Sequence, residues 1–181
     1  MDDNFEDDIE VEDIFANAAR RKKKVNGKKK GNRVELQLCK KLSKHHGETF
    51  SRSVGSGNRW GQVSHMPAHA KQTLVGDICV PENYKWVIEC KGGYDDDVDF
   101  SSVFDGGCAR IDSFIKQSEH DAKTSGRLPI IMWKRSRKPW IAMIRKSDFK
   151  QNLEYQMVYK DWIIVSLDQL LKNTTKDFWF E

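Results

Sequence analysis

The chain has 181 residues, of which 38% are hydrophobic and 32% are charged. This length corresponds to one domain at roughly 150 residues per domain, and it is sufficient to bury a core without disulfide or metal staples. No apolar run reaches the about 18 residues of a membrane span, and the acidic N-terminus argues against a secretory signal. The four cysteines stand singly, without a CxxC pair, so we expect buried free thiols and no zinc ribbon.

The formal net charge of +4 conceals a strong division along the chain. Residues 1–14 contain eight acidic residues and no basic one, which leaves 31 basic against 19 acidic residues in the rest. We expect an acidic, disordered tail at 1–19 and one domain at 20–181 with a basic arm at 20–33. The positive charge favours nucleic acid as the partner. The sequence shows no basic amphipathic helix of the kind that binds a membrane surface. The tail is either inert or folds back on the basic surface, where it would compete with DNA or recruit a partner.

Apolar periodicity and turn residues predict one mixed α/β domain without internal repeats. In chain order we expect a helix at 32–46, a strand at 48–54, a long loop at 55–73, and strands at 74–80 and 85–91 that pair as a hairpin. A helix at 108–123, strands at 128–135, 139–145 and 162–167, and a short helix at 168–173 complete the prediction.

Two acidic residues lie inside apolar strands. Asp77 stands within LVGDICV and Glu89 within KWVIECK, and burying a carboxylate costs several kcal/mol unless a cation compensates it. Lys91 follows Glu89 by two residues and therefore projects from the same strand face. Two neighbouring carboxylates would repel each other unless a divalent cation lay between them, and a hard cation such as Mg²⁺ prefers oxygen ligands. Glu35, on the first predicted helix, is a third candidate acid.

The order of these residues resembles the PD-(D/E)xK nuclease superfamily, and within it the archaeal-type and phage Holliday junction resolvases. The resemblance rests on Lys30-Gly31 before Glu35, the Ser-Gly-rich loop at 52–57, Asp77, Glu89-Cys90-Lys91, and Gln117 on the following helix. It covers about residues 27–145. Two features depart from the family pattern: Gly76 replaces the usual proline before the acid, and the loop between Ser56 and Asp77 is long.

The resemblance implies a restriction-endonuclease-like mixed sheet flanked by helices, and a Mg²⁺-dependent endodeoxyribonuclease in which Mn²⁺ can substitute. Lys91 would orient the attacking water or stabilise developing charge, and Gln117 would position Lys91 or the water. Ser56 or Ser53 would contact the scissile phosphate. The implied catalytic residues are Glu35, Asp77, Glu89, Lys91, Gln117 and Ser56. The implied metal ligands are Glu35, Asp77, Glu89 and the Cys90 carbonyl, and the implied DNA contacts are Lys28, Lys29, Lys30, Arg33, Arg52, Ser53 and Arg59.

A junction resolvase would act on four-way DNA junctions as a homodimer, because the junction has two-fold symmetry. The apolar C-terminal part supplies either the dimer interface or a cap on the core; its candidates are Trp162, Ile163, Ile164, Phe178, Trp179 and Phe180. The expected location is the cytoplasm of a microbe or phage-infected host, or the nucleus if the source is eukaryotic.

Other interpretations remain open at this point. The same residues would serve a superfamily nuclease that cuts duplex or flapped DNA, or would persist in an inactive DNA-binding module. An RNA-binding protein with a basic arm leaves the two strand carboxylates unexplained. Individual residues also have simpler interpretations: Glu35 and Gln117 as solvent-facing helix residues, and Ser53 and Ser56 as flexible loop residues.

Overall fold

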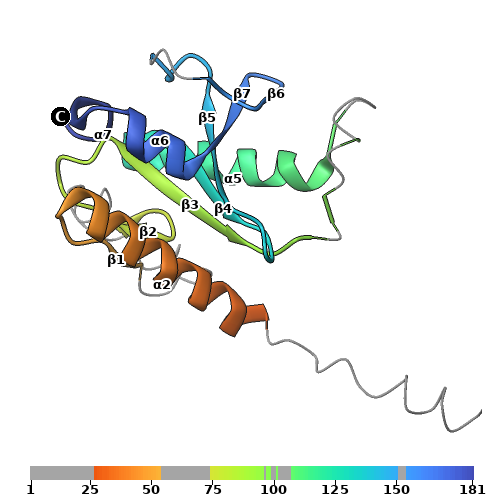
Figure 1. The fold of residues 1–181 in the computed structure, drawn as a ribbon, viewed down its shortest axis with the longest axis horizontal. Helices are drawn as coiled ribbons and strands as arrows, with labels where there is room; N and C mark the ends of the chain where they lie inside the picture. The colour runs from red at the N-terminus through yellow and green to blue at the C-terminus, as the bar shows by residue number, and fades with distance from the viewer. Residues whose placement is uncertain (1–26, 54–73, 96, 99–100, 102–106, 151–153) are drawn as a thin grey trace, which may run out of the picture.

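The computed structural model describes residues 27–53, 74–95, 97–98, 101, 107–150 and 154–181. The elements before the sheet are α2 (Gly27–His46), β1 (Ser51–Arg52) and β2 (Ile78–Cys79). The central elements are β3 (Trp86–Gly92), α5 (Ala109–Ser125), β4 (Leu128–Lys134) and β5 (Trp140–Arg145). The chain ends with β6 (Met157–Tyr159), β7 (Trp162–Ser166), α6 (Leu167–Asn173) and α7 (Lys176–Trp179) (Figure 1).

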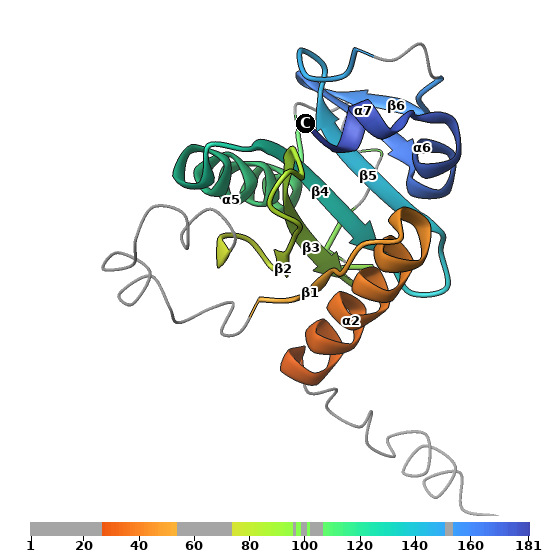
Figure 2. The same ribbon diagram turned by 90° about the vertical axis from the view of Figure 1, so that its left-hand side faces the viewer.

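A five-stranded mixed sheet in the order β3-β4-β5-β7-β6 forms the centre of the molecule. β3 and β4 are parallel and are connected through α5, whereas the other neighbouring strands pair antiparallel. β1 and β2 form a separate two-stranded sheet beside β3 (Figure 2). The predicted mixed α/β, restriction-endonuclease-like sheet flanked by helices is thus confirmed.

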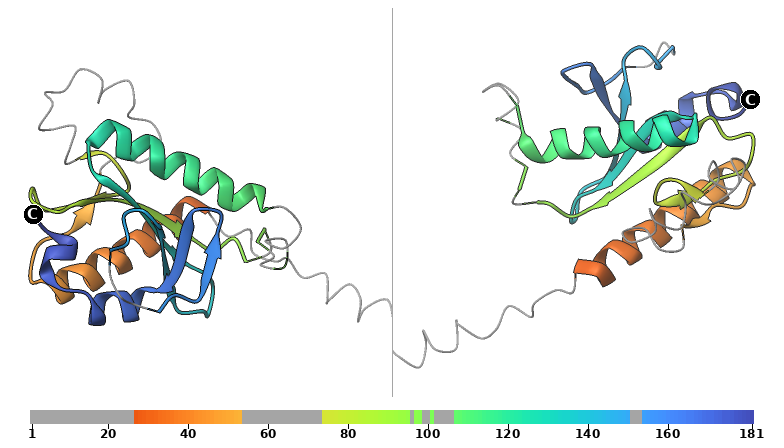
Figure 3. Two further views of the ribbon diagram at one scale, coloured as in Figure 1. Left: turned by 90° about the horizontal axis from the view of Figure 1, so that it is seen from above. Right: turned by 180° about the vertical axis from the view of Figure 1, so that it is seen from behind.

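Helices cover both faces of this sheet, with α5 on one face and α2 and α6 on the other (Figure 3). Side chains alternate along each strand: Ile88 and Cys90 pack in the core with α2, while Ile131 and Trp133 of β4 pack in the core with α5. The intervening position on β3, Glu89, therefore faces α5. Sheet alternation thus directs one acidic residue toward the helix that also carries Gln117.

The predicted hairpin of strands 74–80 and 85–91 is wrong. β2 pairs with β1, in the register Ser51↔Cys79, and β3 joins the other sheet through β4. One backbone hydrogen bond, from the Asp77 N–H to the Ile88 carbonyl, links the two segments at 3.0 Å. The hairpin does not form because the Asp77 side chain, rather than a second strand's backbone, accepts the next hydrogen bond from the outer edge of β3, that of the Cys90 N–H.

Element boundaries also differ from the prediction. α2 begins at Gly27 rather than at residue 32, so the last part of the basic segment lies in its first turns. These turns are held by tertiary contacts that the local pattern does not encode: Val34 packs against Gly92 and Lys30 lies beside Gly93. The strand expected at 48–54 is reduced to Ser51–Arg52, and the short β6 and α7 carried no periodic signal in the sequence.

The aromatic C-terminal part belongs to the core of this chain. Its apolar residues are all at most 7% exposed: Trp162, Ile163, Ile164, Phe178, Trp179 and Phe180. Of the two uses considered for them, packing in the core is the one observed, so they are not available as a dimer interface. All four cysteines are free, as expected; Cys39, Cys90 and Cys108 are buried, whereas Cys79, which was also expected to be buried, is half-buried. Among the described residues no helix combines the length and apolarity needed to cross a bilayer.

Candidate active site

Asp77 covers the outer edge of β3, which is an edge strand of the five-stranded sheet. In addition to its N–H bond to Ile88, its Oδ2 accepts a hydrogen bond from the Cys90 N–H at 2.9 Å. Gly76 permits this approach because its φ is 86° and a Cβ there would lie 2.9 Å from the Ile88 carbonyl oxygen. Proline has φ fixed near −65°. Proline could not adopt the φ of residue 76, which explains why glycine stands here in place of the family's usual proline.

Glu89, Lys91 and Gln117 form a connected chain of hydrogen bonds on the α5 side of β3. Glu89 is 1% exposed, and its Oε1 accepts a hydrogen bond from Lys91 Nζ. Lys91 Nζ also donates to Gln117 Oε1 at 2.9 Å and lies 5.2 Å from the centroid of the Phe114 ring. The parallel connection through α5 thus places Gln117 where it holds the lysine ammonium next to the buried carboxylate.

The electrostatic environment of the carboxylates is unfavourable. Burial raises the pKa of Asp77, although the hydrogen bond from Cys90 opposes the shift. Burial and then the charge of Asp77 raise the pKa of Glu89 well above its usual value. Burial acts to lower the pKa of Lys91, but the Glu89 carboxylate outweighs it, so that the pKa of Lys91 is raised. The single Lys91 ammonium does not balance the negative charge of Asp77 and Glu89 together, and an additional cation would stabilise both carboxylates.

Asp121 is a further buried acid at this place, and the sequence analysis missed it. It lies on α5 and is 4% exposed, and its charge contributes to the raised pKa of Glu89. Burial, followed by the charge of Asp77, raises the pKa of Asp121 to about 6. A signal was present in the sequence: Asp121 continues the buried stripe of α5 that contains Phe114 and Ser118, and an acid on such a stripe is unusual.

Glu35 is near the other carboxylates but is held by an arginine. It is 8% exposed, and its Oε2 accepts a hydrogen bond from Arg52 Nε at 2.6 Å. Arg52 also donates to Asn32 Oδ1 at 2.8 Å. The charge of Glu35 contributes to the raised pKa of Asp77, so the two groups interact. The structure therefore pairs a residue expected to bind metal with a residue expected to bind DNA.

The other expected DNA contacts fall into three groups. Ser53 is buried, and it donates from its N–H to the Asp77 carbonyl and from Oγ to the Leu74 carbonyl, at 2.9 and 3.0 Å. It therefore supports the segment that carries Asp77. Lys29, Lys30 and Arg33 are exposed on α2, and a hollow of about 420 Å³ on this helix includes Lys29 and Arg33. The Lys28 side chain and the residues Ser56 and Arg59 lie outside what the structure describes.

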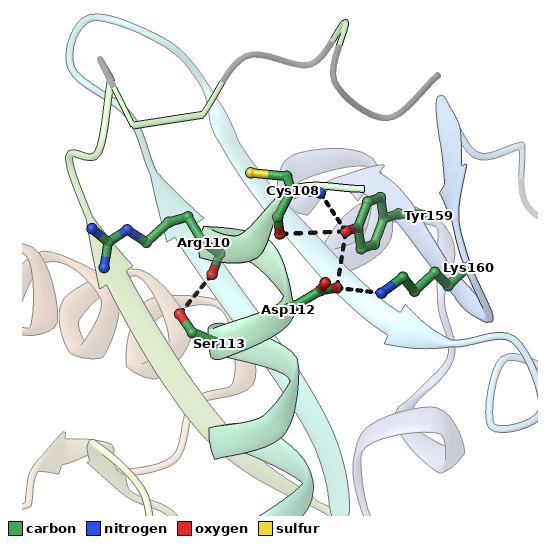
Figure 4. Close-up of polar contacts among 6 residues, drawn as sticks. All are labelled: Cys108, Arg110, Asp112, Ser113, Tyr159 and Lys160. Atoms are coloured by element: carbon green, nitrogen blue, oxygen red, sulfur yellow. Dashed lines mark hydrogen bonds and ion pairs between the residues drawn. The ribbon is translucent and has the colours of Figure 1, made fainter. Parts of the chain in front are cut away.

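A second polar cluster fixes the beginning of α5 (Figure 4). The Tyr159 hydroxyl accepts a hydrogen bond from the Cys108 N–H at 2.7 Å and donates to Asp112 Oδ1 at 2.9 Å. Lys160 Nζ donates to the same Asp112 oxygen at 2.7 Å. These contacts attach the first turn of α5 to β6 and the residue that follows it, and so help to hold the helix that carries Gln117.

The donors at the centre suit a hard divalent cation. Asp77 and Glu89 offer carboxylate oxygens, and Glu89 Oε2 is buried without a hydrogen-bond partner among the described residues, as a metal ligand would be before the ion binds. Within the described part of the chain, no group of three or more His, Cys, Asp and Glu side chains is arranged to hold a metal ion. Since Arg52 occupies Glu35, the available donors are the Asp77–Glu89 pair.

The chain matches one protein-family model over residues 26–180, that of the family described as "Phage putative PDDEXK endonuclease". No curated protein and no solved structure matches the chain in the corresponding comparisons. The family match includes every residue of the centre, and it agrees with the mixed sheet and with the order Asp77, Glu89, Lys91 along the chain. The resemblance to the PD-(D/E)xK superfamily is thereby confirmed, and the chain belongs to this family of phage PDDEXK endonucleases.

Proposed function

We propose that the protein is a divalent-metal-dependent DNA endonuclease that uses Mg²⁺, or Mn²⁺ in its place, and cuts four-way junctions. The observation that carries the nuclease chemistry is the buried Glu89 carboxylate, placed between Lys91 and Asp77 at the edge of the sheet. A buried acid with an unpartnered oxygen destabilises a fold, and such groups concentrate at functional sites.

Each residue of the centre has a role in this proposal. Asp77 and Glu89, with the carbonyl of Cys90, would hold the cation, which when bound lowers the pKa of a water ligand and offsets charge on the phosphate. Lys91, kept protonated by Glu89, would orient the attacking water or stabilise the negative charge that develops on the phosphate. Gln117 would keep the Lys91 ammonium in position. Glu35 would join the metal ligands only if Arg52 moved to a phosphate.

DNA would approach along α2. Lys29 and Arg33 lie at the hollow on this helix, together with Lys40, and Lys30 is exposed next to Gly93 at the end of β3. Phosphate contacts of this kind position a duplex without reading its sequence. Ser56 and Arg59, which the structure does not describe, remain DNA contacts expected from the sequence alone.

Specificity for junctions is the finer part of the proposal. It rests on the resolvase-like Lys30-Gly31 segment before Glu35, on the Ser-Gly-rich loop at 52–57, and on Gln117. It also requires a homodimer, because two symmetric cuts need two centres. The proposed setting is the cytoplasm of a microbe or of a phage-infected cell.

A cleavage assay with Mg²⁺ tests the proposal. A four-way junction, a flapped duplex and a linear duplex of the same sequence are incubated with the wild type, with Glu89→Gln and with Asp77→Asn. Glu119→Gln serves as the matched control, since it removes one carboxylate from α5 outside the contacts of the centre. Paired symmetric nicks in the junction alone, lost in the first two variants and kept in the third, are the expected result.

Other results would redirect the proposal. Cutting of linear or flapped DNA that depends on Glu89 and Asp77 would retain the metal centre and refute junction specificity. Tight junction binding without cleavage would indicate a DNA-binding module, and the catalytic roles would then be wrong.

A further inference from the structure

The turn between β4 and β5 is a basic segment that the proposed function leaves unused. It joins Lys134 to Trp140 and carries four basic residues in the five positions 134–138. Figure 1 shows it at the end of the sheet where β3 ends. Arg137 and Lys138 are exposed, and neither forms an ion pair with another described residue. These two positive charges are therefore available to an external partner.

Asp95, which follows β3, fixes the shape of the turn. Its Oδ1 accepts a hydrogen bond from the Ser136 N–H at 2.9 Å and lies 3.6 Å from Arg135 Nε. Its carbonyl accepts a second hydrogen bond from Arg135, at 3.1 Å. Asp97, another acid after β3, is paired with Arg110 at 3.1 Å. Neither of these two acids is therefore paired with the two exposed charges of the turn.

Arg137 has a backbone conformation that an arginine seldom adopts. Its φ is 59°, in the left-handed region that glycine and asparagine tolerate best. A hydrogen bond from the Lys138 N–H to the Arg135 carbonyl, at 3.3 Å, closes the turn around it. An arginine at this φ costs folding stability, and residues with such a cost concentrate at functional sites. The long basic side chain at this position therefore indicates a binding role.

The turn also lies close to the centre. Lys91 pairs in register with Trp133 of β4, and Arg137 follows Trp133 by four residues. Neighbouring strands are about 5 Å apart and four residues span at most about 14 Å, so the Cα atoms of Lys91 and Arg137 are at most about 19 Å apart. This distance corresponds to about five or six nucleotide steps of one DNA strand. A duplex with a phosphate at the centre would therefore have further phosphates within reach of the turn.

α2 meets the turn at the end of β3. The Gly93 N–H donates to the Lys134 carbonyl at 2.9 Å, and a Cβ on Gly93 would lie 2.6 Å from Lys30 Nζ. The Lys30 ammonium and the beginning of the turn are thus separated by little more than the backbone of one glycine. The basic surface of α2, along which DNA would approach, therefore continues onto the turn.

We propose that the turn between β4 and β5 is a DNA-backbone contact, in which Arg137 and Lys138 bind phosphates that flank the one at the centre. A guanidinium can bind a phosphate through two N–H groups, and an ammonium adds a point charge. Because the phosphates carry no base identity, these contacts raise the affinity for DNA of any sequence. This inference rests on the proposed function, because it takes DNA as the substrate.

Binding of the full chain to a labelled four-way junction and to a linear duplex tests the proposal. Fluorescence anisotropy is measured in EDTA, without cleavage, between about 50 and about 200 mM salt. For Arg137→Gln/Lys138→Gln we expect about tenfold weaker binding at the lowest salt concentration. The slope of log K against log salt concentration should become shallower by about 1.8, since each phosphate contact contributes about 0.9.

Lys123→Gln/Lys176→Gln is the matched control, because it removes two exposed positive charges at the other end of the sheet. Lys123 lies in the last turn of α5, shortly before β4 begins. Lys176 lies in α7, whose Trp179 carbonyl accepts a hydrogen bond from the Lys85 N–H just before β3. This control should keep the affinity and the slope of the wild type.

Arg137→Gly separates binding from folding. Because glycine tolerates a φ of 59°, this variant should melt at the same temperature as the wild type or higher, and still bind DNA more weakly. A lower melting temperature with unchanged DNA binding would make Arg137 a structural residue and refute the inference. Equal affinities and slopes for the wild type and the double variant of the turn would also refute it. An equal loss in the control would do the same, because it would show an effect of net charge alone.

The outcome is separable from the proposed function. Weaker binding in the double variant of the turn, together with no cleavage of any DNA in Mg²⁺ or Mn²⁺, would support the inference and refute the nuclease. Cleavage that depends on Glu89 and Asp77, with DNA binding unaffected by the variants of the turn, would do the reverse.

Discussion

α5 carries two aspartates with opposite environments. Asp112, in the first turn, accepts hydrogen bonds from Tyr159 and Lys160, and the bond from Lys160 is the main cause of its lowered pKa. Asp121, about two and a half turns later, is buried, and burial followed by the charge of Asp77 raises its pKa to about 6. The same residue type on the same helix is satisfied by donors at one end, whereas at the other end the Asp121 Oδ1 has no hydrogen-bond partner within the described part of the chain.

Combined with the proposed function, this difference predicts that the cluster of Asp112, Tyr159 and Lys160 serves stability and that the buried acids near Glu89 serve chemistry. A carboxylate with donors favours the folded state, whereas a buried carboxylate without them opposes it and remains only where something else requires it. We therefore expect substitutions at the Asp112–Tyr159–Lys160 cluster to affect unfolding, and substitutions at the Asp77–Glu89–Lys91 centre to affect cleavage. Four experiments test this contrast and the stability of the surrounding fold.

The largest effect is expected for Glu89→Gln. Cleavage should fall at least about a thousandfold, because a proposed metal ligand and the partner of Lys91 are changed together. The free energy of unfolding without metal should stay equal or rise, since a buried charge is removed. Single-turnover cleavage and urea unfolding in EDTA measure the two quantities. A variant that is strongly destabilised yet still cuts would reverse the assignment of this cluster.

Gly76→Ala should cost about 2 kcal/mol in unfolding free energy and also lower cleavage. The added Cβ is disfavoured at φ 86° and would meet the Ile88 carbonyl oxygen at 2.9 Å, which displaces Asp77 from β3. Gly47→Ala is the matched control: its φ is 72°, but a Cβ there meets nothing within 4 Å. Equal costs at the two glycines would show that close approach to β3 contributes nothing.

Tyr159→Phe should reduce the free energy of unfolding by about 1 to 2 kcal/mol and leave cleavage within about twofold of the wild type. The loss leaves the Cys108 N–H without its hydroxyl acceptor and takes one donor from Asp112. Chemical unfolding and the junction assay measure both effects. Tyr155→Phe, at a tyrosine that is 45% exposed, should be neutral. A large loss of cleavage in Tyr159→Phe would mean that the cluster at the beginning of α5 also controls the chemistry.

The smallest expected effect is a pH dependence of folding stability that arises at His46, a residue away from both clusters. Burial, followed by the charge of His45, lowers the pKa of His46 from 6.5 to about 4, and His46 lies among aromatic rings such as Phe50 and Trp179. Because the folded state disfavours the proton, the contribution of neutral His46 is complete above pH 6.5 and is lost as pH falls toward 4. After allowance for partial exposure, we expect about 1 kcal/mol of stability to be lost over this window.

His46→Phe isolates this contribution. Unfolding free energies of the wild type and the variant are compared at pH 7 and pH 4.5, so that other titrating groups cancel in the difference. The variant should lose less stability than the wild type over this interval. An equal loss in both proteins would exclude His46 as the source.

The elements with strong periodicity were predictable from the sequence. β3, β4, β5 and β7 were found within a few residues because they are apolar runs bounded by turns. α5 was found because Ile111, Phe114 and Ile115 follow helical spacing. The bounds of β1 and β2 were not predicted correctly. Each strand has only two residues, and their pairing depends on how the segment around Asp77 lies along β3.

The candidate site was partly predictable for the same reason. Asp77, Glu89 and Lys91 stood out as charges within apolar strands, and the structure brings them together with Gln117. Asp121 was missed because one acid on a helix ordinarily faces water, and only the packing of α5 on the sheet buries it. The pairing of Arg52 with Glu35 was also missed, because β1 and α2 meet through the chain reversal after α2.

The character of each segment follows from local sequence: which strands are apolar, which acids interrupt them, and where helices run. Which charges meet depends instead on how the segments pack together in three dimensions. β3 pairs in parallel with β4 through α5, and this crossover brings Gln117 to Lys91 and buries Asp121 on the same helix. Local patterns reflect preferences over a few residues, whereas the balance of charge at the centre depends on side chains from β3, α5 and the segment before β2, which are separated in the chain and meet only in the folded core.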